Sequence, residues 1–338
     1  MKRILLFSIA LCAWLYAADV NRDALKMFAP LPAVMDSSKN PITQAKIDLG
    51  RMLYYDPRLS KGQDVSCNTC HQLDRYGADG QPVSAGHKGL KGNRNSPTVY
   101  NAAGHFVQFW DGRAADVEEQ AKGPVTNPVE MAMPSGKIVV AVLNSMPEYQ
   151  AAFRKAFPGE ADPVTFENMA AAIGVFERKL VTPSRWDKFL KGDEKALTAQ
   201  EKAGFNAFIN AGCAMCHNGA YVGGMAYQKL GLAKKWTADA DPGRYGVTKQ
   251  ESERKLFKVP SLRNVDKTGP YFHTGGVPAL GRAVEIMSEY QLGRPIAKQD
   301  VEAILAWLGA LTGDLPADYI RKPALPPATA KTPPPDRS

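Results

Sequence analysis

Cysteine is scarce in this sequence of 338 residues: there are five, and Cys12 lies in an apolar segment at the N-terminus. The other four belong to two Cys-x-x-Cys-His motifs, which leaves none for a structural disulfide. After the N-terminal segment there is no apolar run of about 20 residues, the length that a membrane-spanning helix needs. There is also no basic run and no interleaving of basic and aromatic residues, so the formal net charge of +8 does not indicate nucleic-acid binding.

Residues 1–18 have the pattern of a secretory signal peptide. Lys2 and Arg3 precede an apolar run over residues 4–16, which is followed by Ala17 and Ala18. Because this run is too short for an easy membrane span, we expect cleavage near residue 18, export, and no membrane span in the mature chain. An uncleaved membrane anchor is the alternative interpretation of the same residues.

Strand-like alternation of polar and apolar residues is almost absent, whereas apolar residues recur at helical spacing in many segments. The expected helices are residues 41–55, 114–122, 135–144, 147–157, 166–180, 198–209, 284–290 and 300–311. The predicted fold class is therefore mainly α. Six of the 17 residues from Lys322 onward are proline, which predicts an extended or disordered tail at residues 322–338.

Two short motifs carry the chemistry of the chain. They are Cys67-Asn68-Thr69-Cys70-His71 and Cys213-Ala214-Met215-Cys216-His217. Each is the attachment signature of a c-type haem, in which the two thiols bind the vinyl groups and the histidine becomes the proximal iron ligand. A zinc site or a redox dithiol is the alternative for one such motif alone. Two copies with the same following histidine favour two covalently bound c-type haems.

Each motif follows a predicted helix, residues 41–55 before the first motif and residues 198–209 before the second. This repeated unit predicts two cytochrome c-like helical domains of one architecture, each binding one haem. We place the N-terminal domain at residues 19–181 and the C-terminal domain at residues 182–321.

The motifs do not fix the second axial ligand of either iron. Apart from the proximal histidines the sequence has His87, His105 and His273, and methionine is the other common ligand of c-type haem iron. His87 lies 16 residues after His71, in a glycine-rich loop that can fold back over a haem or move away from it. His105 is more typical of a packed interior. For the second iron, position alone does not select one of the eleven methionines.

Over residues 40–312 the chain resembles the bacterial dihaem cytochrome c peroxidases. The resemblance rests on the two haem motifs, His87, residues 93–98 (Asn-Arg-Asn-Ser-Pro-Thr), 109–113 (Phe-Trp-Asp-Gly-Arg), Gln120, 128–131 (Pro-Val-Glu-Met), 259–265 (Val-Pro-Ser-Leu-Arg-Asn-Val), 270–273 (Pro-Tyr-Phe-His) and Met287. It implies a periplasmic homodimeric peroxidase that detoxifies hydrogen peroxide. The two electrons then come from a small soluble c-type cytochrome or cupredoxin.

The resemblance also implies two unequal haems. The N-terminal haem is the low-potential peroxidatic site, with His71 and His87 as axial ligands. The C-terminal haem is the high-potential electron-transfer site, with His217 and Met287. The resemblance implies that His87 leaves the iron when the second haem is reduced. Residues 72–95 are therefore expected to have two conformations.

Five further residues acquire expected roles from the resemblance. Glu130 transfers a proton during peroxide cleavage, and apolar neighbours that raise its pKa suit that role. Gln120 hydrogen-bonds the bound peroxide. Trp110 mediates electron transfer between the haems, although packing between the domains is its alternative role. Arg113 and His273 are expected beside haem propionates.

A calcium ion between the domains is implied as well. Its ligands are the side-chain oxygen of Asn95 and the main-chain carbonyls of Thr268 and Pro270, completed by water. Two other functions stay open. One is a dihaem electron-transfer cytochrome without a substrate site. The other is a dihaem maturation enzyme that oxidises a protein partner, whose resemblance calls for tyrosine in place of Met287.

Overall fold

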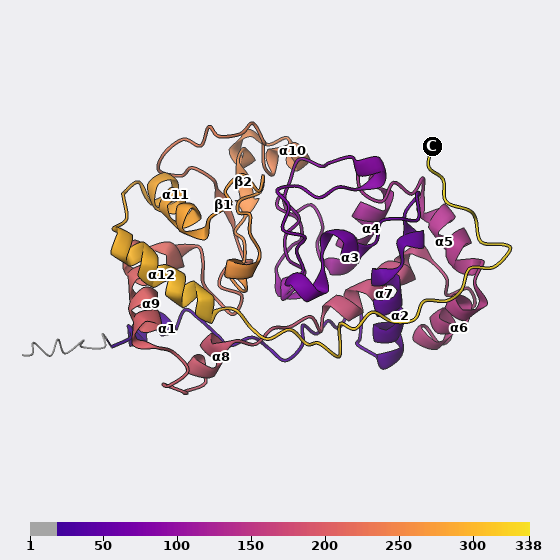
Figure 1. The fold of residues 1–338 in the computed structure, drawn as a ribbon, viewed down its shortest axis with the longest axis horizontal. Coiled ribbons are helices and arrows are strands. Elements are labelled where there is room, and N and C mark those ends of the chain that lie inside the picture. Colours follow the sequence, from indigo (N-terminus) through magenta and orange to yellow (C-terminus); the bar gives the residue numbers. More distant parts are fainter. Residues whose placement is uncertain (1–18) are drawn as a thin grey trace, which may run out of the picture.

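The computed structural model describes residues 19–338, so the predicted signal peptide at residues 1–18 lies outside the described residues. The described chain is mainly helical and forms two lobes that lie side by side (Figure 1). The predicted fold class is confirmed. None of the helices within residues 19–338 is long and apolar enough to cross a membrane.

The first lobe is built on two packed helices, α2 and α7. Its helices are α2 (Gln44–Tyr55), α3 (Cys67–Cys70), α4 (Val117–Thr126), α5 (Gly136–Asn144), α6 (Pro147–Ala156) and α7 (Phe166–Glu177). The Thr43 side chain accepts a hydrogen bond from the Lys46 N–H at 3.2 Å and so caps α2. A Cβ at Gly50 would collide with the carbonyl oxygen of Ala172 on α7, so glycine permits the close approach of these helices.

The second lobe repeats this arrangement with α9 and α12. Its helices are α8 (Arg185–Leu190), α9 (Ala199–Ala211), α10 (Tyr245–Thr248), α11 (Leu280–Leu292) and α12 (Lys298–Ala310). A Cβ at Gly204 of α9 would collide with the carbonyl oxygen of Ala303 on α12, as at the α2–α7 crossing. The strands β1 (Tyr227–Lys229) and β2 (Leu256–Lys258) pair antiparallel, with Tyr227 opposite Lys258.

Short single turns connect these elements. They are α1 (Arg22–Leu25), η1 (Pro57–Leu59), η2 (Leu73–Arg75), η3 (His87–Gly89), η4 (Ala102–Gly104), η5 (Cys213–Met215), η6 (Glu251–Glu253) and η7 (Val265–Lys267). Each of the eight helices expected from apolar spacing is present, and its ends differ from the expected ones by at most four residues.

The two ends of the chain pack against the lobe opposite to their position in sequence. Phe28, near the N-terminus, is buried in the second-lobe core, with its ring 5.7 Å from Trp186 at an angle of 85°. Ile320, near the C-terminus, is buried in the first-lobe core. When the chain is divided between residues 181 and 182, Phe28 falls in the N-terminal part and Ile320 in the C-terminal part. Each of these residues nevertheless packs in the core of the other lobe.

The proline-rich tail at residues 322–338 is extended and lies along the first lobe (Figure 1). The Arg58 side chain donates to the Pro326 carbonyl, and the Gln63 side chain donates to the Pro333 carbonyl, each at 2.8 Å. The main-chain N–H of Asp336 donates to the Lys61 carbonyl at 2.9 Å. Of the two states that the sequence leaves open for the tail, the structure contains the extended one.

Candidate active site

The first haem motif forms the short helix α3, which carries Cys67 and Cys70 one turn apart. His71 follows directly, and its ring Nδ1 lies 2.9 Å from the carbonyl oxygen of Pro97. Because Nδ1 faces a hydrogen-bond acceptor, it is the protonated nitrogen, and Nε2 stays available to a metal. Burial lowers the pKa of His71, which keeps the ring neutral as a metal ligand must be.

The second haem motif follows α9 in the same way. Burial lowers the pKa of His217 to about 4, so this ring is also neutral near pH 7. Its Nδ1 is buried and has no hydrogen-bond partner among residues 19–338. A Cβ at Gly223 would collide with the Pro260 carbonyl and lie 3.2 Å from His217 Nδ1, so glycine leaves room for the ring.

None of the four motif cysteines, Cys67, Cys70, Cys213 and Cys216, forms a disulfide. Burial raises the pKa of Cys67 to about 12 and that of Cys213 to about 11. A zinc site needs thiolates and about four ligands. Within residues 19–338 no three His, Cys, Asp or Glu side chains gather as a metal site. Two thiols followed by a neutral histidine in each motif fit thioether attachment of a haem.

His87 is a buried histidine whose two ring nitrogens lack hydrogen-bond partners among residues 19–338. An unsatisfied buried imidazole is rare and calls for an explanation, and an iron atom supplies one. The backbone around it is tightly held. The Gly86 N–H donates to the Leu90 carbonyl at 2.8 Å, and the His87 N–H donates to the Glu130 carbonyl at 2.7 Å.

Glu130 lies in the turn that contacts His87. The amide Nδ2 of Asn127 donates to its carboxylate at 2.9 Å, and the Glu130 N–H donates to the Asn127 carbonyl at 3.0 Å. Burial raises the pKa of Glu130, although the nearby Arg113 guanidinium and the Asn127 amide act in the opposite direction. The structure thus brings together His87 and a carboxyl group of raised pKa.

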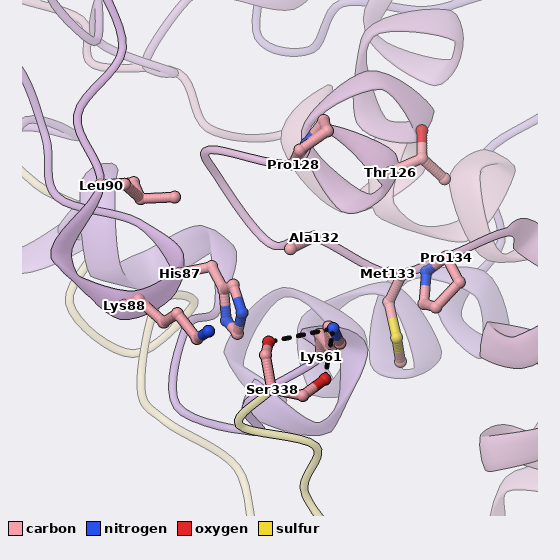
Figure 2. A pocket seen from close by; sticks show the side chains of 10 residues that line it. All are labelled: Lys61, His87, Lys88, Leu90, Thr126, Pro128, Ala132, Met133, Pro134 and Ser338. Carbon is pink, nitrogen blue, oxygen red and sulfur yellow. Dashed lines mark hydrogen bonds between the residues drawn. The ribbon is translucent and has the colours of Figure 1, made fainter.

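A pocket of about 350 Å³ lies beside the His87 ring. Figure 2 shows the ring between Lys88 and the pair formed by Lys61 and Ser338. The Lys61 amine donates to the main-chain and hydroxyl oxygens of Ser338, each at 3.1 Å, so the end of the tail closes one side of the pocket. Glu130 is not among the residues that line this pocket.

Gln120 and Arg113 are two further residues with roles expected from the resemblance. Gln120 lies half-buried on α4. The Arg113 guanidinium lies 3.4 Å from the centre of the Phe109 ring and donates to the Asp111 carboxylate at 3.1 Å. Its side chain is 41% exposed, and it is close enough to lower the pKa of Glu130. The contacts of Arg113 with Phe109 and Asp111 do not test its expected contact with a haem propionate, which stays a prediction.

Trp110 lies where the two lobes meet. Its indole N–H donates to the Asn95 carbonyl at 2.9 Å, and its own carbonyl accepts from the N–H of Lys258 in the second lobe at 2.8 Å. The centre of its ring is 6.3 Å from that of His273, at an angle of 69°. His273 is buried, with Nε2 3.2 Å from Asp239 Oδ2. Trp110 therefore bridges the lobes.

The residues expected to bind calcium come from both lobes. The N–H of Asn95 donates to the His273 carbonyl at 2.7 Å, and His273 follows Thr268 and Pro270 in the chain. The Asn95 amide donates to the Gln81 carbonyl at 3.0 Å. These contacts bring Asn95 next to the segment that contains Thr268 and Pro270.

Met287 lies on a helix of the second lobe, whereas His105 comes from the first half of the chain and contacts residues of the second lobe. Met287 is half-buried on α11. His105 Nδ1 lies 3.3 Å from the amine of Lys258, and its ring packs edge-on against Tyr221 at 5.5 Å between centres. His105 thus has the interior packing expected of it. Lys258 and Arg94, two buried or half-buried cations near Trp110, had no role assigned from the sequence.

The di-haem cytochrome c peroxidase family profile matches residues 44–195. Cytochrome c551 peroxidase of Pseudomonas aeruginosa is 49% identical over 325 residues, 94% of this chain and 93% of the relative. Cytochrome c551 peroxidase of Nitrosomonas europaea is 45% identical over 330 residues, 97% and 96% of the two chains.

A similar fold is present in a solved structure, that of a MauG-like protein associated with microbial copper homeostasis. It is 26% identical to this chain, with a TM-score of 0.77, and the match covers 87% of this chain and 97% of the other. Two haem-attachment motifs, a shared fold and close full-length relatives agree. The chain belongs to the di-haem cytochrome c peroxidase family.

Proposed function

We propose that this chain is an exported cytochrome c peroxidase that reduces hydrogen peroxide to two molecules of water, consuming two electrons and two protons. The observation that carries the proposal is the buried, unpartnered His87 ring held against the Glu130 turn. The full-length relatives named cytochrome c551 peroxidase support it.

When bound, the first haem would supply the iron at which peroxide is cleaved. His71 and His87 would hold that haem, and movement of the segment that carries His87 would open the site to peroxide. Glu130 then accepts a proton from the near peroxide oxygen and returns it to the far oxygen, which leaves as water. A raised pKa suits a carboxyl group that first accepts a proton and then returns it.

The remaining residues orient the substrate and the electron path. Gln120 hydrogen-bonds peroxide, and Trp110 lies on the route between the lobes. His217 and Met287 hold the second haem, which accepts electrons from a small c-type cytochrome or cupredoxin. Retention of methionine at position 287 favours the peroxidase over the protein-oxidising enzyme.

Four finer features belong to the same proposal. They are a calcium ion held by Asn95, Thr268 and Pro270, propionate contacts of Arg113 and His273, a homodimer, and a periplasmic location after cleavage near residue 18. The main-chain bond from Asn95 to His273 supports the calcium site, because it joins the two segments that supply the ligands.

Peroxide turnover with a reduced c-type cytochrome, before and after partial reduction, tests the function. We expect turnover after partial reduction. Glu130→Gln, which keeps the shape and removes the titratable proton, should lower turnover by about 10²–10⁴-fold. Both haem spectra should stay unchanged. Absence of turnover both before and after partial reduction would refute the peroxidase function. Full activity of Glu130→Gln would refute the role of Glu130.

A further inference from the structure

His87 lies on a hairpin whose tip is exposed and whose base is closed. Ala85 and Lys91 pair as an isolated antiparallel bridge, and the hydroxyls of Ser84 and Ser96 lie 2.8 Å apart at the base. Residues 88–93 are exposed, whereas His87 is buried. The hairpin over residues 84–96 is therefore a small unit that can turn about its base.

Arg94, at this base, is bound by the second lobe. Its Nε and Nη2 atoms donate to the two carboxylate oxygens of Asp241, at 2.7 and 2.8 Å, and its Nη1 atom donates to Asp111 of the first lobe. The side chains of Arg94 and Asp241 are only 16% and 6% exposed. A bidentate pair with this burial is rigid, and loss of Asp241 leaves Arg94 paired with Asp111 of the first lobe alone.

Two neighbouring contacts attach the same base to the second lobe. The Asn95 N–H donates to the carbonyl of His273 at 2.7 Å. A Cβ at Gly275 would collide with the carbonyl of Pro82, so the second lobe packs directly on the strand that enters the hairpin. The second lobe thus contacts the base, while Gly86 and His87 contact the first lobe at the Glu130 turn.

The second-lobe partners of the base also contact one another. The Asp241 N–H donates to the Asp239 carboxylate at 3.0 Å, and Asp239 lies 3.2 Å from the His273 ring. The His273 ring faces Trp110, whose indole N–H donates to Asn95. A displacement of this cluster by the second lobe is transmitted to the hairpin base through both Arg94 and Asn95.

We propose that Arg94 is a positioning residue that couples the second lobe to the His87 hairpin: its pair with Asp241 holds His87 inward, and movement of Asp241 releases it. The inference rests on the proposed function, because it concerns the ligand whose departure opens the active site. His87 has one main-chain bond to Glu130, whereas the base is held by the ion pair of Arg94 with Asp241 and by the main-chain bond of Asn95 to His273. The base therefore controls the orientation of the hairpin.

Asp241→Asn in the haem-loaded protein tests the coupling. Asparagine keeps the acceptor for the Gly243 N–H, which bonds Asp241 at 2.8 Å, but removes the charge that binds Arg94. In the fully oxidised variant we expect the high-spin, five-coordinate fraction of the first haem to rise above that of the unchanged protein. Hydrogen exchange of residues 85–93 should accelerate by about tenfold.

Two variants separate coupling from loss of stability. Asp241→Glu keeps the charge, so this variant should have the low-spin spectrum and the slow hydrogen exchange of the unchanged protein. Glu118→Gln breaks the Glu118–Arg178 pair of the first lobe, whose side chains are 16% and 6% exposed, a close match to the Arg94–Asp241 pair. It should lower the melting temperature without changing the spin state or the hairpin exchange.

A wild-type spin state and wild-type exchange at residues 85–93 in Asp241→Asn would overturn the proposal. Opening of the hairpin in Glu118→Gln to the same extent would also overturn it, because general destabilisation would then be sufficient. Hairpin exchange is measured without peroxide, so its result is independent of whether the unchanged protein shows turnover.

Discussion

Burial and two neighbouring groups change the pKa of the Glu130 carboxyl in different directions. Burial raises the pKa, and the Arg113 guanidinium and the Asn127 amide lower it, with burial the largest effect. A group that first accepts a proton and then returns it works best when its pKa approaches the working pH. With Glu130 as the proposed proton carrier, we expect Arg113 to affect the pH range of turnover.

Replacement of Arg113 by glutamine should move the acidic limb of the pH–rate profile to higher pH. Removal of the cation removes an influence that lowers the pKa of Glu130, so the carboxyl is protonated at a higher pH and cannot accept a proton. The measurement is the pH dependence of kcat/KM. Arg113→Lys keeps the charge and serves as the control, and an unshifted limb in Arg113→Gln would contradict the assignment of Glu130 as the titrating group.

Residues with a fixed local spacing can be predicted from the sequence, as the two haem motifs show. Glu130 has no such spacing, and only the resemblance to the peroxidases singles it out. The contact between Arg94 and Asp241 joins residues 147 positions apart, and neither residue lies in a pattern that indicates the other. Long-range ion pairs of this kind require the three-dimensional structure.

Among the elements, the His87 hairpin depends on one close main-chain contact. A Cβ at Gly86 would lie 2.5 Å from the Glu130 carbonyl oxygen and 2.6 Å from its Cα. Glycine therefore lets the hairpin approach the Glu130 turn closely enough for the His87 N–H to bond the Glu130 carbonyl.

Gly86→Ala should push the hairpin away from the Glu130 turn and release His87. We expect faster hydrogen exchange at residues 85–91 and a larger high-spin fraction of the first haem in the oxidised protein. Gly92→Ala is the matched control, since a Cβ at Gly92 meets nothing within 4 Å. Equal behaviour of the two variants would show that the Gly86 contact does not hold the hairpin.

Helices were predictable because an apolar face has a period, whereas this hairpin has none. The α2 and α7 helices begin at the residues that threonine caps select, Thr43 and Thr165. The α4 helix continues to Thr126, beyond the expected end at residue 122. The hairpin is held by main-chain bonds and a serine pair, which leave no periodic signal in the sequence.

At the scale of the whole molecule, the composition did not indicate that each end of the chain packs against the other lobe. A proline-rich segment has little apolar surface to bury, and sequence alone does not show which lobe its carbonyls contact. In the structure, Arg58, Gln63 and Lys61 bind the tail, and Ser338 reaches the pocket beside His87.

Removal of residues 323–338 should weaken the first lobe selectively. The deletion leaves the side chains of Arg58, Gln63 and Ser145 without their tail partners. We expect faster hydrogen exchange in residues 56–65 and 142–146 and unchanged exchange in α9 of the second lobe. Unchanged exchange in the first lobe would show that the tail contributes nothing to its stability.

In the proposed mechanism the two haem sites are unequal and His87 is a removable ligand of the first haem. The most direct test is the absorption and magnetic circular dichroism spectrum of the half-reduced protein. We predict that, once the second haem is reduced, the first changes from six-coordinate low-spin to five-coordinate high-spin. Two haems that both stay six-coordinate at half reduction, with no reaction on addition of peroxide, would contradict the account.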